Sequence, residues 1–263
     1  MNQRQVTLPT TPLLGVDFHL ATMDVVVEAV YAMLGESTPP CRYVVPINVN
    51  MCVAMQSDAL FHQVVAEADL RVVDSRPVLL LSRLLGPALP GVVPGSDLVP
   101  ALFGAAEARG GLDVYLLGAM PGVGARAAEA IGHRWPAVRV VGVDAPPLGF
   151  ENDPEENRRI LERIERARPQ LLILGLGAPK QEMWIHRHRA DVRAGVALCA
   201  GATIDFLAGE QTRAPRWVQR ASLEWLYRML SQPRRLAGRY IRDGLAMPGL
   251  IAEECRRRKG RST

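Results

Sequence analysis

Acidic side chains directly follow some of the short apolar runs in this sequence, and carboxylates in such places can do chemistry. The run Leu70–Val73 leads straight into Asp74, which could take a proton from an incoming hydroxyl group. Asp74 or the next residue, Ser75, could equally cap the helix expected to follow. Asp205 comes shortly after the last apolar run, where it could accept a hydrogen bond from a base or a sugar, or cap the residues after it. The residue types alone leave both interpretations open at both places.

Two glycine-containing segments leave apolar runs in the same way. Backbone amides in the segment 118–124, which starts at Gly118, could hold a phosphate where the next helix begins. The segment lacks the G-x-G-x-x-G spacing of a dinucleotide-binding turn, so a tight strand-to-helix turn is the simpler interpretation. In the segment 175–182, Gly177 precedes Lys180 and Gln181, whose side chains could meet phosphate or sugar hydroxyls. The alternative for these two side chains is an exposed first helical turn.

The elements that must position these residues alternate along the chain up to about residue 210. Short β-branched or apolar runs predict strands at 42–46, 70–73, 113–117, 138–143, 170–174 and 196–199. Amphipathic spacing predicts helices between them, at 51–68, 78–85, 98–108, 124–135, 154–167 and 180–189. Alternation of this kind indicates an α/β fold, with a mainly parallel sheet covered by helices on both faces. Ligands bind beyond the carboxyl ends of the strands in such a sheet, which is where the residues above fall.

The C-terminal region differs from the rest in charge. Residues 213–263 contain 13 of the 31 Lys and Arg residues but 4 of the 27 Asp and Glu residues. Arg235, Arg239 and Arg242 have i, i+4 and i+7 spacing, which places them on one face of a helix, and Gly244 and Pro248 are expected to interrupt it. We therefore expect two parts, an α/β domain at 1–210 and a basic helical appendage at 211–263. The charge favours an anionic partner such as nucleic acid, a membrane surface or phosphate groups, unless it only keeps this end of the chain soluble.

Several kinds of protein are not supported by the sequence. It contains no G-x-x-x-x-G-K-[ST], G-x-S-x-G or H-E-x-x-H motif, and no D-x-D pair that would hold a divalent metal. The four cysteines are far apart along the chain and form no C-x-x-C pair. No leader is expected at the start, and no apolar run approaches the roughly 20 residues of a membrane span. We therefore expect a cytoplasmic protein without a metal site.

A series of short motifs occurs along most of the chain. They are Gly95-Ser96-Asp97-Leu98, Gly177-Ala178-Pro179-Lys180-Gln181-Glu182 with Trp184, Asp205-Phe206-Leu207-Ala208-Gly209, Arg213-Ala214-Pro215 with Trp217, Glu224-Trp225-Leu226-Tyr227-Arg228, and Pro233-Arg234-Arg235. Through these motifs, and from Leu14 to about Tyr240, the chain resembles the WecG/TagA/CpsF family of bacterial glycosyltransferases. The resemblance implies a Rossmann-like α/β catalytic domain with a C-terminal helical appendage.

The resemblance also implies a reaction. Family members transfer a hexose, typically N-acetylmannosamine or a related sugar, from a UDP donor, with inversion and without a metal or other cofactor. The acceptor is a sugar on an undecaprenyl-diphosphate lipid at the cytoplasmic face of the membrane, in cell-surface polysaccharide synthesis. We therefore expect a UDP-sugar donor, a lipid-linked acceptor, peripheral contact with an anionic membrane surface, and self-association into a homo-oligomer. Nucleic acid is a weaker candidate, because Trp217, Trp225 and Tyr240 resemble helix-packing residues more than stacking platforms.

By position, the resemblance gives roles to single residues. Asp74 matches the catalytic base, which would deprotonate the acceptor hydroxyl during direct displacement of UDP. From the motifs and the strand ends together, the residues expected to bind substrate are Asn48, Gly118, Gly177, Gln181 and Asp205. Arg228, Arg235 and Arg239 are expected to neutralise a diphosphate, for which the forked guanidinium group is suited.

Three neighbours of these residues depart from the family pattern. Pro46 replaces a threonine, Ser75 a glycine and Val92 an arginine. These departures keep two alternatives open. One is a transferase that acts on a soluble natural-product acceptor, and the other is a non-catalytic protein that binds a sugar nucleotide.

Overall fold

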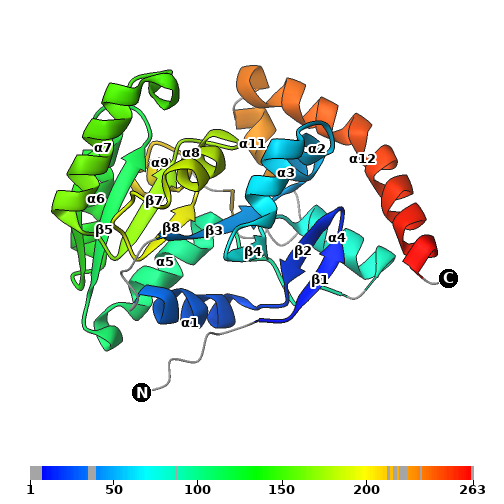
Figure 1. Ribbon diagram of the computed structural model, residues 1–263, viewed down its shortest axis with the longest axis horizontal. Coiled ribbons are helices and arrows are strands. Elements are labelled where there is room, and N and C mark those ends of the chain that lie inside the picture. Colours follow the sequence, from blue (N-terminus) through cyan, green and yellow to red (C-terminus); the bar gives the residue numbers. More distant parts are fainter. Residues whose placement is uncertain are drawn as a thin grey trace.

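The computed structural model describes residues 8–34, 40–86, 88–211, 214–215, 218, 224–231 and 233–261 (Figure 1). Its centre is a six-stranded sheet in the order β4-β3-β8-β7-β5-β6, in which all paired neighbours run parallel. The strands are β3 (Arg42–Ile47), β4 (Leu70–Val73), β5 (Leu112–Gly118), β6 (Val138–Asp144), β7 (Leu171–Gly175) and β8 (Val196–Cys199). Each corresponds to a strand predicted from the sequence, which confirms the α/β fold with a parallel sheet.

Helices cover both faces of this sheet (Figure 1). One face carries α1 (Met23–Leu34), α5 (Gly95–Ala105), α6 (Val123–Arg134) and α9 (Thr203–Leu207). The other carries α2 (Val49–Ser57), α3 (Ala59–Ala66), α7 (Pro154–Ala167) and α8 (Lys180–His188), with α4 (Arg76–Leu85) next to β4. Alternate residues of β7 serve opposite faces, since Leu172 and Leu174 pack on the α8 side whereas Leu171 and Ile173 pack on the α6 side. All four are fully buried, as expected for a central strand covered on both sides.

Asp58 divides the helix predicted at 51–68 into α2 and α3. The backbone at Asp58 is extended (φ −124°), so α2 ends there. Its carboxylate accepts the backbone N–H of Phe61 at 2.9 Å, so α3 begins directly afterwards. A capping aspartate of this kind stabilises a helix by about 1 kcal/mol. The expectation of one continuous helix was therefore wrong, because apolar spacing continues on both sides of the break and conceals it.

Two elements near the start of the described chain were not predicted from the sequence: α1, and the hairpin of β1 (Thr10–Leu13) and β2 (Val16–His19). The hairpin turns at Leu14 and Gly15, which both have left-handed backbone angles (φ 53° and 82°). It lies beside β4, where the backbone N–H of Arg71 donates to Nδ1 of His19 at 3.0 Å. The hairpin therefore extends the β4 side of the molecule.

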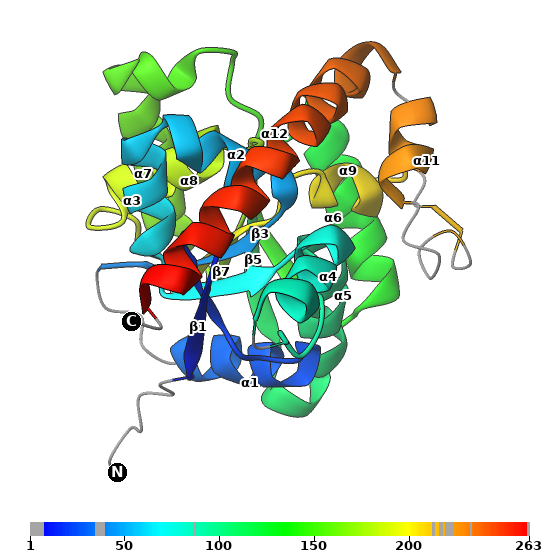
Figure 2. The same ribbon diagram turned by 90° about the vertical axis from the view of Figure 1, so that its right-hand side faces the viewer.

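The C-terminal region forms α11 (Glu224–Ser231) and α12 (Pro233–Arg261). The sequence predicted an interruption at Gly244 and Pro248, but α12 continues through both. Packing outweighs local helix propensity here, because Leu250 is buried in the core cluster on the α2 side. Figure 2 shows α12 crossing in front of α2 towards the β1–β2 hairpin. The division of the chain near residue 210 stays a prediction.

Two short 3₁₀ helices lie in the connections: η1 (Glu107–Arg109) and η2 (Phe150–Asn152). η2 lies close to the start of α8, since Nζ of Lys180 is 2.9 Å from Oε1 of Glu151. Within the residues that the structure describes, no helix is both long enough and apolar enough to cross a membrane.

Candidate active site

The connections of the sheet reverse direction between β5 and β7. β5 leads through α6 to β6 on one side, whereas β7 leads through α8 to β8 on the other, and α6 and α8 cover opposite faces. A crevice opens at the carboxyl ends of the strands at such a switch point, and ligands of this architecture bind there. Gly118 ends β5 with φ +123°, and a Cβ atom on it would lie 2.6 Å from the carbonyl carbon of Gly175, where β7 ends. Glycine is therefore required for close approach at this point, and the substrate-binding role of Gly118 stays a prediction.

Asp74 and Asn48 meet where β4 and β3 end. Asn48 follows β3 and Asp74 follows β4, and these strands are neighbours in the sheet. Nδ2 of Asn48 donates to Oδ2 of Asp74 at 3.2 Å. Oδ1 of Asn48 accepts the backbone N–H of Met51 at 3.2 Å and so caps α2. One asparagine thus fixes both the direction of the carboxylate and the start of the neighbouring helix.

Ser75 is the N-cap residue of α4, but its side chain makes no capping hydrogen bond. Its Oγ atom is buried and has no hydrogen-bond partner in the described part of the chain. The sequence offered Asp74 or Ser75 as the cap of α4, and for the Ser75 hydroxyl this prediction is wrong. The Asp74 carboxylate next to it is half-buried and receives the Asn48 amide.

Gln181 is buried in the first turn of α8 and connects two parts of the site. Its side chain is 4% exposed, so the expectation of an exposed first turn was wrong at this residue. Oε1 of Gln181 accepts the backbone N–H of Gly201 at 3.2 Å, and Nε2 donates to Oε1 of Glu182 at 2.7 Å. Gln181 therefore joins α8 to the turn after β8. Its predicted contact with substrate stays a prediction.

Glu182 is fully buried beside Gln181, and sequence reasoning gave it no separate role. Burial raises its pKa to about 7, although the hydrogen bond from Gln181 acts in the opposite direction. Its Oε2 atom has no hydrogen-bond partner among the described residues. The spacing of Glu182 and Ile185, three residues apart on the buried face of α8, was the signal that could have placed this carboxyl group inside.

Gly177 and Asp205 lie near this connection. Gly177 has φ +80°, and its carbonyl oxygen accepts the backbone N–H of Gln181 at 3.0 Å. Asp205 lies inside α9, which begins at Thr203, so the alternative that Asp205 caps the residues after it is wrong. Oδ2 of Asp205 accepts a hydrogen bond from Nε2 of Gln211 at 2.9 Å. Their contacts with substrate stay predictions.

The arginines expected to neutralise a diphosphate belong to α11 and α12. The side chains of Arg228 and Arg235 lie outside the described residues. Arg239 is half-buried, and its Cζ atom lies 5.3 Å from the ring centroid of Tyr240. Its Nε atom is buried and has no hydrogen-bond partner among the residues that the structure describes. Because an unpaired buried donor is costly, this guanidinium group is suited to an anionic oxygen.

The predicted residues of the α/β part follow one another along the carboxyl edge of the sheet. In strand order, these residues are Asp74 after β4, Asn48 after β3, Asp205 after β8, Gly177 after β7 and Gly118 at the end of β5. Neighbouring strands are about 4.8 Å apart, so the three spacings from β4 to β7 amount to about 14 Å. The edge therefore has a carboxylate towards one end and, towards the other, glycines at the switch point between β7 and β5.

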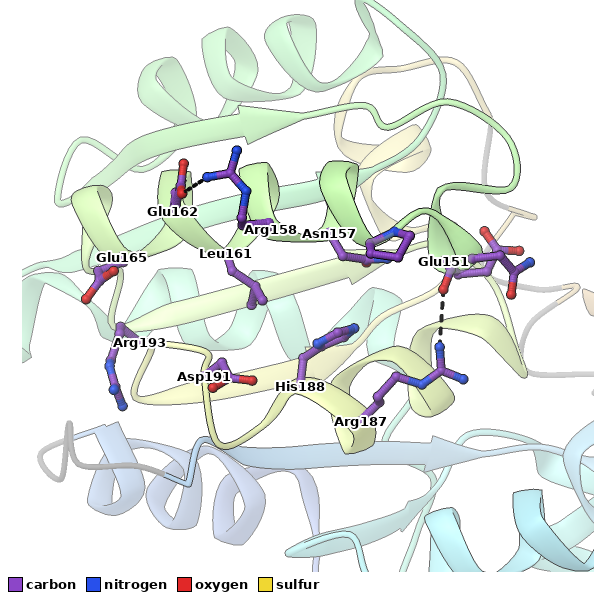
Figure 3. A pocket seen from close by; sticks show the side chains of 12 residues that line it. Glu151, Asn157, Arg158, Leu161, Glu162, Glu165, Arg187, His188, Asp191 and Arg193 are labelled. Carbon is purple, nitrogen blue, oxygen red and sulfur yellow. Dashed lines mark hydrogen bonds and ion pairs between the residues drawn. The ribbon is translucent and has the colours of Figure 1, made fainter.

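A cavity of about 690 Å³ lies elsewhere, between α7 and α8 (Figure 3). Its lining combines acidic and basic side chains, among them Glu162, Arg158 and Arg193. None of the predicted site residues whose side chains are described lines it. The described parts of the chain also contain no group of three or more His, Cys, Asp or Glu residues that could hold a metal ion.

The edge just described falls within a long match to known proteins. Residues 11–261 match the Glycosyl transferase WecG/TagA/CpsF family. The chain belongs to this family. The match extends through α12, so the long C-terminal helix is part of the region shared with the WecG/TagA/CpsF family. As a member, the protein is a glycosyltransferase, as the sequence motifs predicted.

Individual members of the WecG/TagA/CpsF family are similar over most of their length. The chain is 28% identical over 224 residues to the N-acetylglucosaminyldiphosphoundecaprenol N-acetyl-beta-D-mannosaminyltransferase of Staphylococcus aureus (strain MRSA252), which covers 85% of each chain. The protein of the same name from Bacillus spizizenii (strain ATCC 23059 / NRRL B-14472 / W23) is 28% identical over 193 residues, or 73% of this chain and 72% of the relative. That from Bacillus subtilis (strain 168) is 28% identical over 189 residues, or 72% and 71%.

Proposed function

We propose that this glycosyltransferase moves N-acetylmannosamine from a UDP donor to N-acetylglucosamine on undecaprenyl diphosphate, in the synthesis of a cell-surface polymer. The names of the relatives support this sugar and this acceptor. The observation that carries the proposal is the pair formed by Asn48 and Asp74 at the strand ends, where an oriented carboxylate can act as a base. Glycosyl transfer to a hydroxyl group needs such a base.

Asp74 is the general base in this proposal. Its carboxylate takes the proton of the acceptor hydroxyl, whose oxygen forms a bond to the anomeric carbon of the donor sugar. The bond from that carbon to the UDP oxygen breaks, UDP leaves from the opposite side, and the anomeric centre is inverted. A positioned base of this kind contributes about 10²–10⁴-fold to a rate. The hydrogen bond from Asn48 keeps the carboxylate directed while the proton moves.

The UDP part of the donor is proposed to lie in the crevice between β5 and β7. α6 and α8 both begin shortly after these strands, and in the described part of the chain the N-cap residue of neither helix makes a side-chain capping bond. Amides at helix N-termini are suited to phosphate oxygens. The distance of about 14 Å from β7 to β4 leaves room for the donor sugar between the diphosphate and Asp74. Arg239 would stabilise the charge on a diphosphate at this edge.

A lipid-linked acceptor places the reaction at a membrane surface, which is part of the proposal. On α12, Ile241 and Leu245 are one helical turn apart and are 61% and 79% exposed, and Arg256 and Lys259 are also exposed. Apolar and basic side chains of this kind are suited to an anionic lipid surface. We therefore propose that the protein works at the inner face of the cell membrane. The self-association expected from the family resemblance stays a prediction.

The proposal is tested by calorimetric titration with UDP and a panel of UDP-sugars, with and without EDTA, followed by transfer to a lipid analogue carrying N-acetylglucosaminyl diphosphate. We expect selective binding of UDP-N-acetylmannosamine that EDTA does not change, and a product with inverted configuration. A product formed only with soluble acceptors would support the natural-product alternative. Binding without any product would support the non-catalytic alternative, and no binding of UDP would contradict all three.

A further inference from the structure

The strongly basic C-terminal region contains two almost fully buried carboxylates. Asp243 is 4% exposed and Glu254 is 5% exposed. Both accept hydrogen bonds from the α/β part, since Oδ1 of Asp243 is 3.0 Å from Nδ2 of Asn50 and Oε2 of Glu254 is 2.9 Å from the backbone nitrogen of Leu14. A buried carboxylate is costly without such partners. These two contacts therefore help to hold α12 in place along the body of the molecule, together with the packing of Leu250.

The contact of Asp243 is made with the helix turn that also carries the proposed site. Asn50 lies in the first turn of α2, and Asn48 is the N-cap residue of the same helix. Asn48 donates to Asp74, and Asn50 donates to Asp243. The start of α2 is thus bonded both to the proposed base and to α12, and α12 passes beside α2 (Figure 2).

Arg239 lies four residues before Asp243 on α12. Residues four apart lie on the same side of a helix, separated by about 6 Å along its axis. The contact of Asp243 with α2 therefore also restrains the position of Arg239 relative to α2, both along the axis of α12 and around it. The buried Nε atom of Arg239 has no partner among the described residues, so at this position it keeps a donor available for a ligand oxygen.

We propose that Asp243 is a positioning residue, which acts through Asn50 to hold Arg239 where it meets the diphosphate of a substrate bound at the carboxyl edge of the sheet. This role rests on the proposed function. Asp243 itself does not touch substrate. The proposal accounts for the burial of an acidic residue in a region where basic residues outnumber acidic ones by 13 to 4.

The test exchanges the two partners. Asn50→Asp places two carboxylates face to face, and the double variant Asn50→Asp with Asp243→Asn restores one donor and one acceptor in exchanged positions. Glu253→Gln is the matched control, because it removes an acidic group from an exposed pair with Arg257 on the same helix. For each protein, kcat and KM are measured with UDP-sugar and acceptor, and hydrogen exchange is measured for the backbone amides of residues 233–245.

We expect Asn50→Asp to lower kcat/KM at least about tenfold and to speed exchange in the first half of α12, as breaking a charge-assisted contact does. The exchanged pair should return both readouts to within about threefold of the original protein, and Glu253→Gln should leave both unchanged. The effect must also act through Arg239, so Asp243→Ala should slow a protein that already carries Arg239→Ala by less than about twofold.

Three results would overturn the proposal. Full activity of Asn50→Asp would show that the contact does not matter for turnover, and failure of the exchanged pair to recover would show that pairing is not the cause. If the loss of kcat/KM in the double variant equals the product of the losses in Asp243→Ala and Arg239→Ala, the two residues act independently. If the original protein forms no product with any donor, the proposed function fails, and with it the role assigned to Arg239. If the original protein is active and Asn50→Asp is equally active, only the role of Asp243 is refuted.

Discussion

Asp74 receives the Asn48 amide where two neighbouring parallel strands end, so its carboxylate has a fixed direction before any substrate binds. Asp74→Asn keeps the size of the side chain but removes the group that takes the proton. We expect kcat to fall about 10²–10⁴-fold, with UDP binding and thermal stability little changed. Steady-state kinetics together with calorimetry measure these quantities. The matched control is Asp191→Asn at an exposed loop position, and normal turnover of Asp74→Asn would exclude Asp74 as the base.

Glu182 makes stability depend on pH, because burial raises its pKa from the usual 4.5 to about 7. The folded protein holds this proton more tightly than the unfolded chain does. The stabilisation is therefore complete below about pH 4.5 and is lost as the pH rises through about 7. Glu182→Gln removes this loss, so the variant should become more stable than the original protein as the pH rises, by up to about 3 kcal/mol near pH 8.

Urea unfolding of both proteins between about pH 4 and about pH 8 measures this difference, since the free energy of unfolding extrapolates linearly with denaturant. Glu129→Gln, which changes an exposed residue of α6, is the control for removing one carboxylate. If the difference in free energy of unfolding between Glu182→Gln and the original protein stays constant across this range, folding does not raise the pKa of Glu182.

Some residues of the candidate site could be predicted from the sequence, and others could not. Asp74 and Gln181 could be selected because each follows a strand, and the ends of parallel strands share one edge of a sheet. The pairing of Asp74 with Asn48 depends on the strand order, which local patterns do not contain. The burial of Glu182 was missed because a glutamate in the first turn of a helix is normally a solvated residue.

Among the elements, those with strong local patterns were predictable. The continuous apolar run of β7 and the amphipathic spacing of α7 were predicted with almost the observed bounds. The β1–β2 hairpin was missed because its strands have four residues each, too few for a clear alternation. The interruption expected at Gly244 and Pro248 was wrong, because long-range packing of α12 decides its course there. Sequence patterns thus located the strands of the sheet and the helices next to them better than the β1–β2 hairpin and the course of α12, which depend on contacts between distant parts of the chain.

The close approach of β5 and β7 gives a test of how the switch point of the sheet is built. Gly118→Ala places a Cβ atom 2.6 Å from the carbonyl carbon of Gly175, at a left-handed backbone angle. We expect destabilisation by at least about 2 kcal/mol together with weaker UDP binding, because backbone rather than a flexible side chain must move. The control is Gly132→Ala in α6, where a Cβ would meet nothing within 4 Å and the higher helix propensity of alanine should stabilise the protein by about 1 kcal/mol. Chemical denaturation and calorimetry distinguish the two, and equal stability of both variants would contradict this account.

In the molecule as a whole, α12 joins distant parts of the chain and carries much of the positive charge. Its buried acidic groups bond to α2 and to the β1–β2 hairpin, while Arg256 and Lys259 remain exposed. The positive charge, for which the sequence predicted an anionic partner, is thus carried by a helix that is held at two places along its length. If such a helix binds a lipid surface, the carboxyl edge of the sheet is held at a constant distance and orientation from that surface.

This arrangement predicts binding to anionic lipid that depends on α12. In sedimentation with vesicles, we expect the full chain to bind phosphatidylglycerol-containing membranes and to be released as salt screens the charges, with little binding to neutral vesicles. Combining Arg256→Glu with Lys259→Glu should weaken binding at least about tenfold, since each basic group near the surface contributes about 1 kcal/mol. Combining Arg134→Glu with Arg193→Glu changes the net charge equally at exposed positions away from α12, and should have a much smaller effect. Equal weakening by both pairs would mean that net charge alone attracts the protein, and α12 would then have no special place at the membrane.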